Sequence, residues 1–266
     1  MTEQELVDAA RLAVVLARRA GDLAVAWQQR ARADAKGDGA DVVTDADRAA
    51  EALIAAGIAE RFPDHGILGE EEGEQGAGPD AELRWLIDPL DGTNNYVLGL
   101  DVYGVCITLC RGGEPLVAVV HDSPRRRTFW AVAGGGAFLE GPDDGEPQRL
   151  DLGAASPLRV TTVSFTQGYA VEHGDARRDR VFGALERSAK RVLRTWAPSA
   201  DWGLLAQGRV GALVAYRNEV WDLVGGRLLA TEAGAEAVDD PSGELVLVGH
   251  PRVVAELRGV LGLGAV

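Results

Sequence analysis

Two aspartates in the middle of the sequence point most directly to a chemistry. They stand at positions i and i+3 of the stretch Trp85-Leu-Ile-Asp88-Pro-Leu-Asp91-Gly-Thr-Asn94, which predicts a buried strand that turns at Pro89. Across such a turn both carboxylates can point at one centre, and carboxylate oxygens are the ligands that hard cations such as Mg²⁺ prefer. The alternative is an ordinary turn with solvated carboxylates, because Asp-Pro and Asp-Gly pairs are common in turns. We interpret the stretch as a metal site.

The residues that follow this aspartate pair suit an anion. Gly92 lets the backbone approach a ligand closely, and Gly92-Thr93-Asn94 predict the start of a helix or turn. The free backbone N–H groups at such a start favour binding of a phosphate. The sequence therefore predicts an anion site, formed by Asp91 to Asn94, beside the metal site.

Three other acidic positions are weak signals when each is taken alone. Glu70 follows the short predicted strand Ile67-Leu68, where a carboxylate can supply another metal oxygen, but it also begins a run of glutamates typical of a solvated loop. Asp47 and Asp222 fall at the starts of predicted helices, where capping and the helix dipole favour a carboxylate in any protein. These positions gain meaning only in combination with the aspartate pair.

The first part of the chain predicts helices followed by an antiparallel sheet. Thr2-x-x-Glu5 is a capping-box pattern, and apolar residues at helical spacing after it predict one or two helices over residues 3–30. Val42-Val43 predicts a short strand, and a second helix follows to about Arg61. After an acidic loop from Glu70 to Pro79, consecutive strands are predicted over residues 102–110, 115–121 and 128–133.

Strands and helices alternate in the second part, which indicates an α/β layer. The predicted strands cover residues 158–165, 191–195, 211–215 and 245–248, and the predicted helices cover about 176–189, 199–208, 222–233 and 251–261. The segment 141–157 begins rich in Pro, Gly and Asp, so we place a boundary there. This division gives a lobe 1–145 with the antiparallel sheet and most metal ligands, and a lobe 146–266 with Asp222 and the segments that select the substrate.

The composition limits the possible partners and compartment. The 266 residues hold 27 Lys and Arg against 41 Asp and Glu, a formal charge of −14 that disfavours nucleic acid and anionic membranes as partners. Cys106 and Cys110 would lie about 13 Å apart along a strand, too far for a disulfide, so we expect buried thiols. A polar, acidic N-terminus and the lack of a long uncharged apolar run predict a cytoplasmic protein.

In their order and spacing, the acidic segments resemble the inositol monophosphatase family. The segments are Asp41-x-Val-Thr-x-x-Asp47, Gly69-Glu70-Glu71, Asp88-Pro-Leu-Asp91-Gly-Thr93 and Trp221-Asp222-x-x-x-Gly-x-x-x-x-x-Glu232-Ala-Gly. Gly134-Gly-Gly-Ala-Phe138 is similar to the family's Gly-x-Gly-Ala-Phe turn, and the likeness extends from about residue 5 to residue 262. The resemblance implies a magnesium-dependent, lithium-sensitive phosphomonoesterase.

The same resemblance implies the metal ligands. The first Mg²⁺ would take Glu70, Asp88 and the carbonyl oxygen of Leu90. The second would take Asp88, Asp91 and Asp222, so that Asp88 bridges the two ions. A third, weaker ion would lean on Glu70, which makes two or three ions in all.

The resemblance also implies the roles of the remaining site residues. Thr93 and Asp47, with Glu70, would position and help to deprotonate the attacking water. Lys36 stands at the position of a family lysine near the site, and Glu71 belongs to the matching Gly-Glu-Glu segment. The four histidines match no family motif, so we expect His121 and the others to be surface or structural groups.

Substrate selection is expected in the second lobe, where the sequence departs from its relatives. Ala215 replaces the glutamate that inositol-specific members carry seven residues before the metal aspartate, and the neighbouring Arg217 is offered instead. Arg194-Thr-Trp196 looks like the Arg-x-Trp-Gly-Asp loop of histidinol-phosphate phosphatases, but Ala197-Pro198 replaces the Gly-Asp. We expect Arg194, Trp196 and Arg217 to contact the substrate, and Trp202 and Trp221 to lie in the core.

Together these observations predict an α+β or α/β protein, a layered αβαβα sandwich of the inositol monophosphatase and fructose-1,6-bisphosphatase type, with the metals between its lobes. The expected reaction is hydrolysis of a small phosphorylated metabolite, such as a polyol, sugar, amino-alcohol or nucleoside phosphate. A 3′(2′),5′-bisphosphate nucleotidase or fructose-bisphosphatase-like member is one alternative, and a non-catalytic relative that binds metal or a partner is another. A homodimer is the expected assembly.

Overall fold

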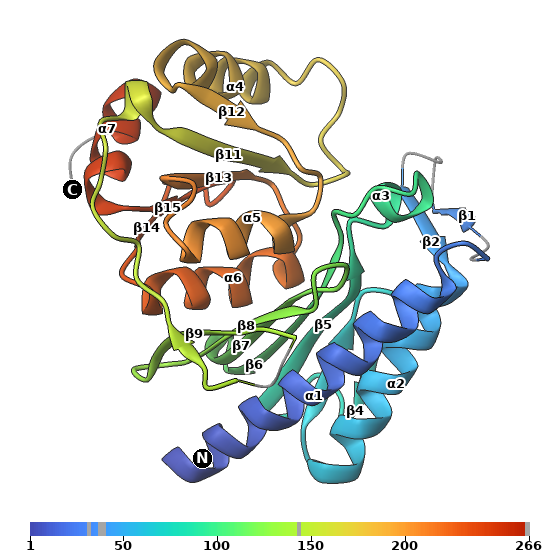
Figure 1. Cartoon of the computed structure of the whole chain (residues 1–266). Helices are drawn as coiled ribbons and strands as arrows, with labels where there is room; N and C mark the ends of the chain where they lie inside the picture. The colour runs from blue at the N-terminus through green and yellow to red at the C-terminus, as the bar shows by residue number, and fades with distance from the viewer. Residues whose placement is uncertain (31–32, 37–40, 143–144, 264–266) are drawn as a thin grey trace.

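Two large β-sheets alternate with three pairs of helices, so that the described part of the chain has five layers (Figure 1). The computed structural model describes residues 1–30, 33–36, 41–142 and 145–263, with the side chains of all of these except 35, 36, 41 and 42. From one side to the other, the layers are the helices α1 (Glu3–Trp27) and α2 (Asp45–Arg61), an eight-stranded sheet, α5 (Pro198–Ala206) and α6 (Val220–Glu232), a five-stranded sheet, and α4 (Ala176–Ser188) and α7 (Pro251–Leu261). This order confirms the predicted αβαβα sandwich.

Capping boxes begin both helices of the first layer, α1 (Glu3–Trp27) and α2 (Asp45–Arg61). The hydroxyl of Thr2 accepts a hydrogen bond from the backbone N–H of Glu5, whose carboxylate accepts one from the N–H of Thr2, as the sequence predicts. Thr44 and Asp47 form the same arrangement at the start of α2. The buried face of α1 consists mostly of alanine, which lets the helix lie close to the sheet.

The eight-stranded sheet is antiparallel except where β3 pairs with β5 in parallel. In spatial order its strands are β10 (Gln148–Arg149), β9 (Gly136–Glu140), β8 (Arg127–Val132), β7 (Glu114–Asp122), β6 (Gly104–Arg111), β5 (Leu83–Asp91), β3 (Gly66–Gly69) and β4 (Gly73–Gly76). Strands β6, β7 and β8 confirm the predicted antiparallel run. Successive residues of β6 face opposite layers: Ile107 packs against α1 and α2, and Cys106 packs against α5 and α6.

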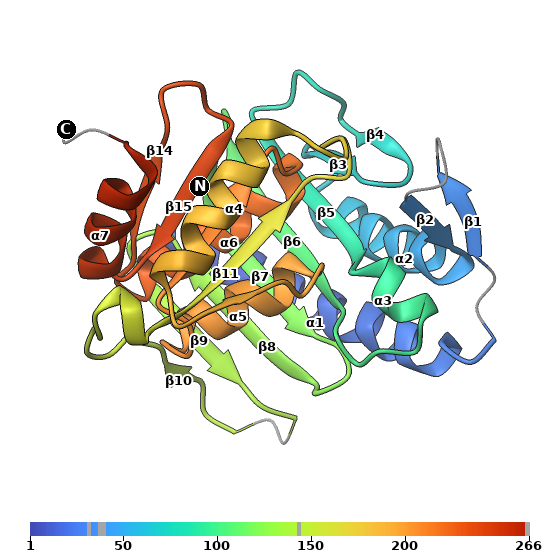
Figure 2. The ribbon, with the colours of Figure 1, turned by 90° about the horizontal axis from the view of Figure 1, so that it is seen from above.

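The five-stranded sheet belongs to the second part of the chain. Its order is β12 (Arg191–Leu193), β11 (Thr162–Gln167), β13 (Ala212–Tyr216), β15 (Leu245–Gly249) and β14 (Glu236–Asp239). The helices of this part are α4 (Ala176–Ser188), α5 (Pro198–Ala206), α6 (Val220–Glu232) and α7 (Pro251–Leu261). Seen from above, its strands cross those of the larger sheet in a different direction, with α5 and α6 between them (Figure 2).

Several short strands were not predicted. These are β4, β9, β10, β14 and β1 (Ala33–Lys36), which pairs with β2 (Asp41–Thr44). Strand β4 lies inside the predicted acidic loop; it has no apolar alternation and forms because its backbone pairs with the edge of β3. The strand expected over 158–165 begins later, at Thr162, after a short 3₁₀ turn.

The two-lobe division at residue 145 stays a prediction, although the chain enters the second sheet only at Thr162, after β10 has completed the edge of the first. Both cysteines are free and buried, as expected. Of the helices that the structure describes, none combines the length and apolar character needed to cross a bilayer.

Candidate active site

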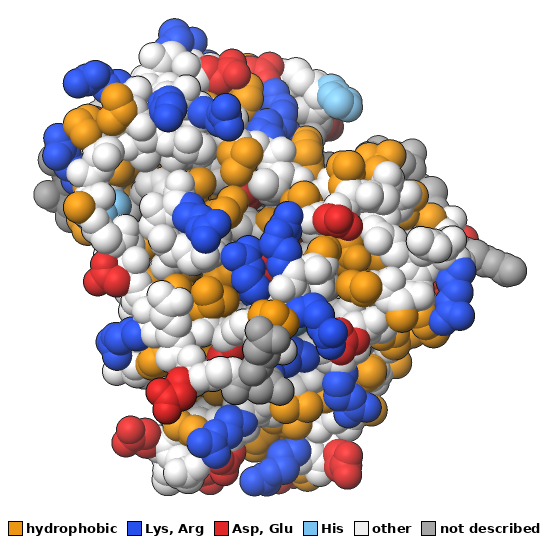
Figure 3. Space-filling view, viewed as in Figure 1, with side chains coloured by type: hydrophobic (Ala, Val, Ile, Leu, Met, Phe, Trp, Pro, Cys, Tyr) orange, Lys and Arg blue, Asp and Glu red, His pale blue; other side chains and the backbone are white. Residues whose placement is uncertain are grey.

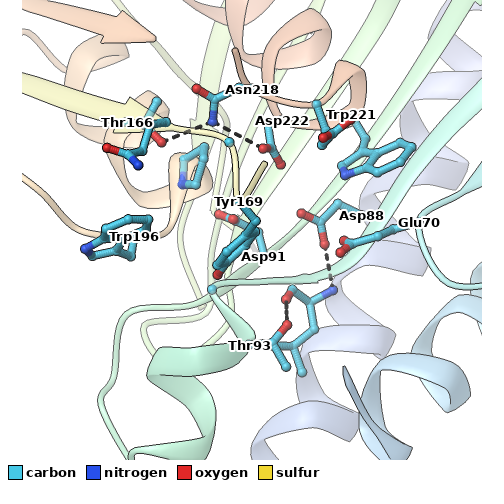
Figure 4. Close-up of a pocket in the computed structure, with 16 residues that line it drawn as sticks. Glu70, Asp88, Asp91, Thr93, Thr166, Tyr169, Trp196, Asn218, Trp221 and Asp222 are labelled. Carbon is cyan, nitrogen blue, oxygen red and sulfur yellow. Dashed lines mark hydrogen bonds between the residues drawn. The ribbon is translucent and has the colours of Figure 1, made fainter. Parts of the chain in front are cut away.

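A pocket of about 350 Å³ lies where the end of β5 meets the starts of α5 and α6 and the end of β11 (Figure 4). Its lining comes from both sheets and from the helices between them. The lining residues are Glu70, Asp88, Leu90, Asp91, Gly92, Thr93, Thr166, Gln167, Gly168, Tyr169, Trp196, Pro198, Asn218, Glu219, Trp221 and Asp222. The structure thus brings together eight residues that were predicted for the site from distant parts of the sequence.

An irregularity in β5 directs Asp88 and Asp91 to the same side. Asp88 pairs with Cys106 and Asp91 with Gly104, so two residues of β5 oppose a single residue of β6. In a regular strand, residues at i and i+3 point to opposite faces, and one extra residue reverses this. Pro89 fits the irregular position because it has no N–H to donate. The predicted tight turn after Asp88 is therefore wrong, but the predicted convergence is correct and has a different cause.

Asp222, at the first turn of α6, completes a group of three carboxylates. Ligand oxygens of Asp88, Asp91 and Asp222 lie within 4.8 Å of one another. Asp88 and Asp91 are buried, and Asp222 is half-buried. Burial raises the pKa of Asp91 to about 7, and burial followed by the neighbouring negative charges raises the pKa of Asp88 and of Asp222 well above the ordinary value. Three carboxylates in this position repel one another.

The residues around this group fit a divalent cation. None of the described residues that line the pocket is Lys, Arg or His, so no side chain there offsets the carboxylate charge. A buried charge needs a partner of opposite sign, and Mg²⁺ binds through oxygens of this kind. Glu70 lines the same pocket and its charge raises the pKa of Asp88, but it lies outside the close group of three.

Neighbouring groups hold the carboxylates in place. The backbone N–H of Ser199, at the start of α5, donates a hydrogen bond of 2.5 Å to Oδ2 of Asp91. The side-chain amide of Asn218 donates to Oδ2 of Asp222 at 3.3 Å, and Nε1 of Trp202 donates to the carbonyl oxygen of Asp222 at 2.7 Å. Helix starts stabilise negative charge, so α5 favours the charged form of Asp91.

Asp47 and Thr93 form a buried pair beside the carboxylates. Oγ1 of Thr93 lies 3.0 Å from Oδ1 of Asp47 and 2.9 Å from the carbonyl oxygen of Leu90. A hydroxyl carries one proton, so it donates to one of these two oxygens at a time. Burial raises the pKa of Asp47, so this carboxylate is more basic than an exposed aspartate.

Gly92 makes the chain reversal between Asp91 and Thr93 possible. Its φ of +85° is in the left-handed region, and a Cβ there would lie 2.9 Å from both Ala197 Cβ and the carbonyl oxygen of Val102. The short helix α3 (Thr93–Val97) begins directly after it, as predicted.

Six predicted site residues are not in the described lining of the pocket, and Asp47, which lies beside it, is one of them. Asn94 and Arg194 line an adjoining pocket, where Asn94 donates a hydrogen bond of 3.1 Å to Tyr169 Oη. The guanidinium of Arg217 forms ion pairs with Glu244 and Asp175 and lines neither pocket, so its contact with the substrate stays a prediction. The other two, Glu71 and Lys36, differ in kind: the backbone N–H of Glu71 donates to Glu51 at 2.9 Å, and the side chain of Lys36 is outside the described part.

The sequence analysis missed one wall of the pocket. This wall is formed by Thr166 to Tyr169, at the end of β11 and directly after it, and by Trp221, which is half-buried and lines the pocket instead of lying in the core. Trp202 is fully buried, as predicted. The available signal was the Gly168-Tyr169 pair after a predicted strand, since ligand sites commonly form at strand ends.

Comparison with known proteins agrees with this geometry. The inositol monophosphatase family matches residues 5–263. The chain is 34% identical over 251 residues to a protein of Escherichia coli strain K12 named Nus factor SuhB, covering 91% of both chains. It is 30% identical over 222 residues to a fructose-1,6-bisphosphatase/inositol-1-monophosphatase of Aquifex aeolicus, covering 82% of this chain and 76% of that protein.

A solved structure shows the same fold. The crystal structure of extragenic suppressor protein SuhB from Bartonella henselae superposes with a TM-score of 0.85 at 25% identity, covering 97% of this chain and 100% of the other. The match covers nearly all of the sequence, and the acidic segments meet in one pocket. The chain belongs to the inositol monophosphatase family.

Proposed function

We propose that the protein is a Mg²⁺-dependent phosphomonoesterase that hydrolyses a small phosphorylated metabolite. The observation that carries the proposal is the convergence of Asp88, Asp91 and Asp222 in a pocket whose described lining has no cationic side chain. Such a site takes up divalent cations first, and only then attracts a phosphate dianion. Membership of the family and the name of the Aquifex relative support this reaction class.

The metal ligands in this proposal are those of the sequence analysis. Glu70, Asp88 and the Leu90 carbonyl oxygen would hold one ion, and Asp88, Asp91 and Asp222 would hold the other, so that Asp88 would be shared. All of these residues line the pocket. Two Mg²⁺ ions, when bound, would neutralise the phosphoryl oxygens and acidify the attacking water. A third ion beside Glu70 remains part of the proposal.

Thr93 and Asp47 move the proton in this proposal. When Thr93 donates its proton to Asp47, its oxygen lone pairs can accept a proton from water, and the Leu90 carbonyl oxygen is left with free lone pairs. The start of α3 and the backbone at Gly92 to Asn94 would orient the phosphate. Base assistance of this kind contributes about 10²- to 10⁴-fold to a rate.

Phosphate release with and without Mg²⁺ tests the proposal. The substrates are inositol phosphate, histidinol phosphate, 3′-phosphoadenosine 5′-phosphate, fructose bisphosphate and nucleoside monophosphates. Mg²⁺-dependent turnover of at least one ester, lost in Asp222→Asn, is the expected result. If none is hydrolysed by the metal-loaded wild-type protein, the catalytic proposal fails.

The alternative is a non-catalytic role, because the E. coli relative is named a Nus factor and not an enzyme. Metal binding without turnover of any ester would favour that role. A small phosphorylated metabolite as the partner, the absence of a nucleic-acid partner, the homodimer and the cytoplasmic location stay predictions of the sequence.

A further inference from the structure

A second pocket of about 430 Å³ adjoins the first and has the opposite charge. The two pockets share Gln167, Gly168, Tyr169 and Trp196. Where the first is lined by carboxylates, the second is lined by the guanidinium groups of Arg178 and Arg194. In the space-filling view the surface is hollowed between the upper part of the molecule and the part that carries α3 (Figure 3).

Arg194 has no acidic partner in the described part of the chain. Its guanidinium carbon lies 4.5 Å from the ring centre of Trp196 and 5.3 Å from that of Phe182, and Nη2 donates a hydrogen bond of 3.1 Å to Gln167 Oε1. Arg178 differs, because its charge is paired with Asp179 at 2.6 Å. Burial and the charge of Arg178 both lower the pKa of Arg194, which shows that this cation lacks compensation.

The loop that presents Trp196 is strained and firmly held. Trp196 has a φ of +56°, a conformation that costs a bulky residue of the order of 1–3 kcal/mol, and its side chain is 39% exposed. The hydroxyl of Thr195 donates to the buried Asp201 at 2.8 Å, and the side-chain amide of Asn95 donates to the carbonyl oxygen of Thr195 at 2.8 Å. These two bonds hold the aromatic ring at the boundary between the pockets.

Tyr169 extends this aromatic boundary. Its ring lies 6.2 Å from that of Trp196 with 28° between their planes, and its side chain is 42% exposed. A ligand that reaches from the carboxylates to Arg194 would pass along these two rings. The one acidic side chain of the second lining, Glu172, is exposed, so solvent screens its charge.

We propose that Arg194 binds a second anionic group on the leaving-group side of the substrate, a phosphate or a carboxylate, while Tyr169 and Trp196 contact the part that connects it to the scissile phosphate. This inference rests on the proposed phosphomonoesterase function. It excludes leaving groups that place an ammonium group in the second pocket, because Arg194 and Arg178 would repel it.

Matched substrates test the inference. The set is glycerol 3-phosphate and adenosine 3′-phosphate, which have neutral leaving groups, with 3-phosphoglycerate for the carboxylate and adenosine 3′,5′-bisphosphate for the phosphate. The readout is the ratio of kcat/KM for each substrate with a second anion to that for its neutral counterpart. Wild-type protein is expected to favour at least one doubly anionic substrate, and the pair that shows it distinguishes carboxylate from phosphate.

Three variants assign that preference to Arg194. Arg194→Gln is expected to lower the ratio about 10- to 100-fold, the value of a hydrogen bond to a charged group. Arg194→Lys keeps the positive charge and is expected to retain most of the preference for the doubly anionic substrate. Its activity also shows that a substitution at this position leaves the protein folded. Arg180→Gln removes an exposed charge on α4, the helix that carries Arg178, outside both linings, and is expected to leave the ratio unchanged.

The failures are distinguishable. If the neutral esters are hydrolysed and a second anion brings no advantage, or if Arg194→Gln leaves the ratio unchanged, the inference is overturned and the proposed function stands. If no ester in the set or in the earlier panel is hydrolysed with Mg²⁺, both fall together.

Discussion

The carboxylate of Glu51 occupies the space beside Gly69 in which any other residue would carry its side chain. A Cβ atom at position 69 would lie 2.0 Å from Oε1 of Glu51. Glu51 is fully buried on α2 and accepts hydrogen bonds from the backbone N–H groups of Glu71, at 2.9 Å, and of Glu72, at 3.1 Å. The residue between these contacts is Glu70, so α2 fixes the backbone that carries this carboxylate.

Replacing Gly69 by alanine is therefore expected to displace Glu70 and reduce activity. The methyl group cannot fit beside Glu51, and a displacement of about 1 Å near reacting groups can cost on the order of 10²-fold in rate. Steady-state kinetics measured against Mg²⁺ concentration would show a lower kcat and a higher Mg²⁺ concentration for half-maximal activity. Gly141→Ala, where the new methyl group meets open space, is the matched control. Wild-type kinetics in Gly69→Ala would contradict this role of Glu51.

Thr93→Val tests the proton path. Valine keeps the shape of the side chain but removes the hydroxyl that bridges Asp47 and the Leu90 carbonyl oxygen. We expect kcat to fall about 100-fold, within the range of lost base assistance. Thr93→Ser, which retains the hydroxyl, should keep most of the activity. Because Asp47 acts through the same hydroxyl, adding Asp47→Asn to Thr93→Val should lower kcat little further; an additive loss would show that the two residues act separately.

Removing one carboxylate should stabilise the metal-free protein and abolish its response to Mg²⁺. Burial raises the pKa of Asp91 to about 7, so ionisation of this carboxyl at pH 8 costs more free energy in the folded state than in the unfolded state. Asp91→Asn is expected to raise the free energy of unfolding without metal by up to about 4 kcal/mol, because the pKa rises from 3.8 to about 7 and each pKa unit corresponds to about 1.4 kcal/mol. The free energy of unfolding of the wild-type protein should rise by about 2.7 kcal/mol when Mg²⁺ is at 100 times its Kd. That of the variant should rise much less.

Urea unfolding at pH 8, with EDTA or with MgCl₂, measures both effects. An equal gain from Mg²⁺ in wild type and Asp91→Asn would mean that the ion binds elsewhere.

His121 should make stability depend on pH. It is 1% exposed, its Nδ1 lies 3.0 Å from the hydroxyl of Thr128, and burial lowers its pKa to about 4 from 6.5. The unfolded chain therefore binds one more proton than the folded chain between these values, so stability is lost as the pH falls from about 6.5 towards 4. The expected loss is roughly 3 kcal/mol.

The variant His121→Asn isolates this effect, because it cannot titrate. The difference in free energy of unfolding between wild type and His121→Asn, measured by urea titration with EDTA at several pH values, should shrink by roughly 3 kcal/mol across that window. A difference that stays constant with pH would contradict the assignment to His121.

The sequence indicated which carboxylates belong together, but not why they converge. Asp88 and Asp91 were assigned to one site through a predicted turn, whereas an irregular register between β5 and β6 directs them together. Register depends on the partner strand, which a local pattern does not show. The layers were predictable because apolar residues alternate along the strands and recur at helical spacing in the helices.

The wall of the pocket that comes from the second part of the chain was less predictable. Arginine is a typical residue for binding phosphate, so the sequence favours Arg217 as a ligand. In the structure Arg217 forms an ion pair with Glu244, which lies 27 residues away in the sequence. Trp221 was expected in the core, but it is half-buried at the start of α6 and lines the pocket. The ion pair forms because β13 and β15 are neighbours, with Tyr216 opposite Leu245, and the place of Trp221 depends on how α6 packs between the two sheets. No single segment of the sequence encodes either arrangement.

The most direct measurement is an anomalous difference map from crystals grown with Mn²⁺, which binds oxygen ligands as Mg²⁺ does. We expect peaks among the carboxylates of Glu70, Asp88, Asp91 and Asp222, with Asp88 in contact with two of them, and no such peaks in crystals of Asp91→Asn and Asp222→Asn. A wild-type map with no peak between Asp88, Asp91 and Asp222, at Mn²⁺ concentrations that saturate the protein in solution, would contradict the account.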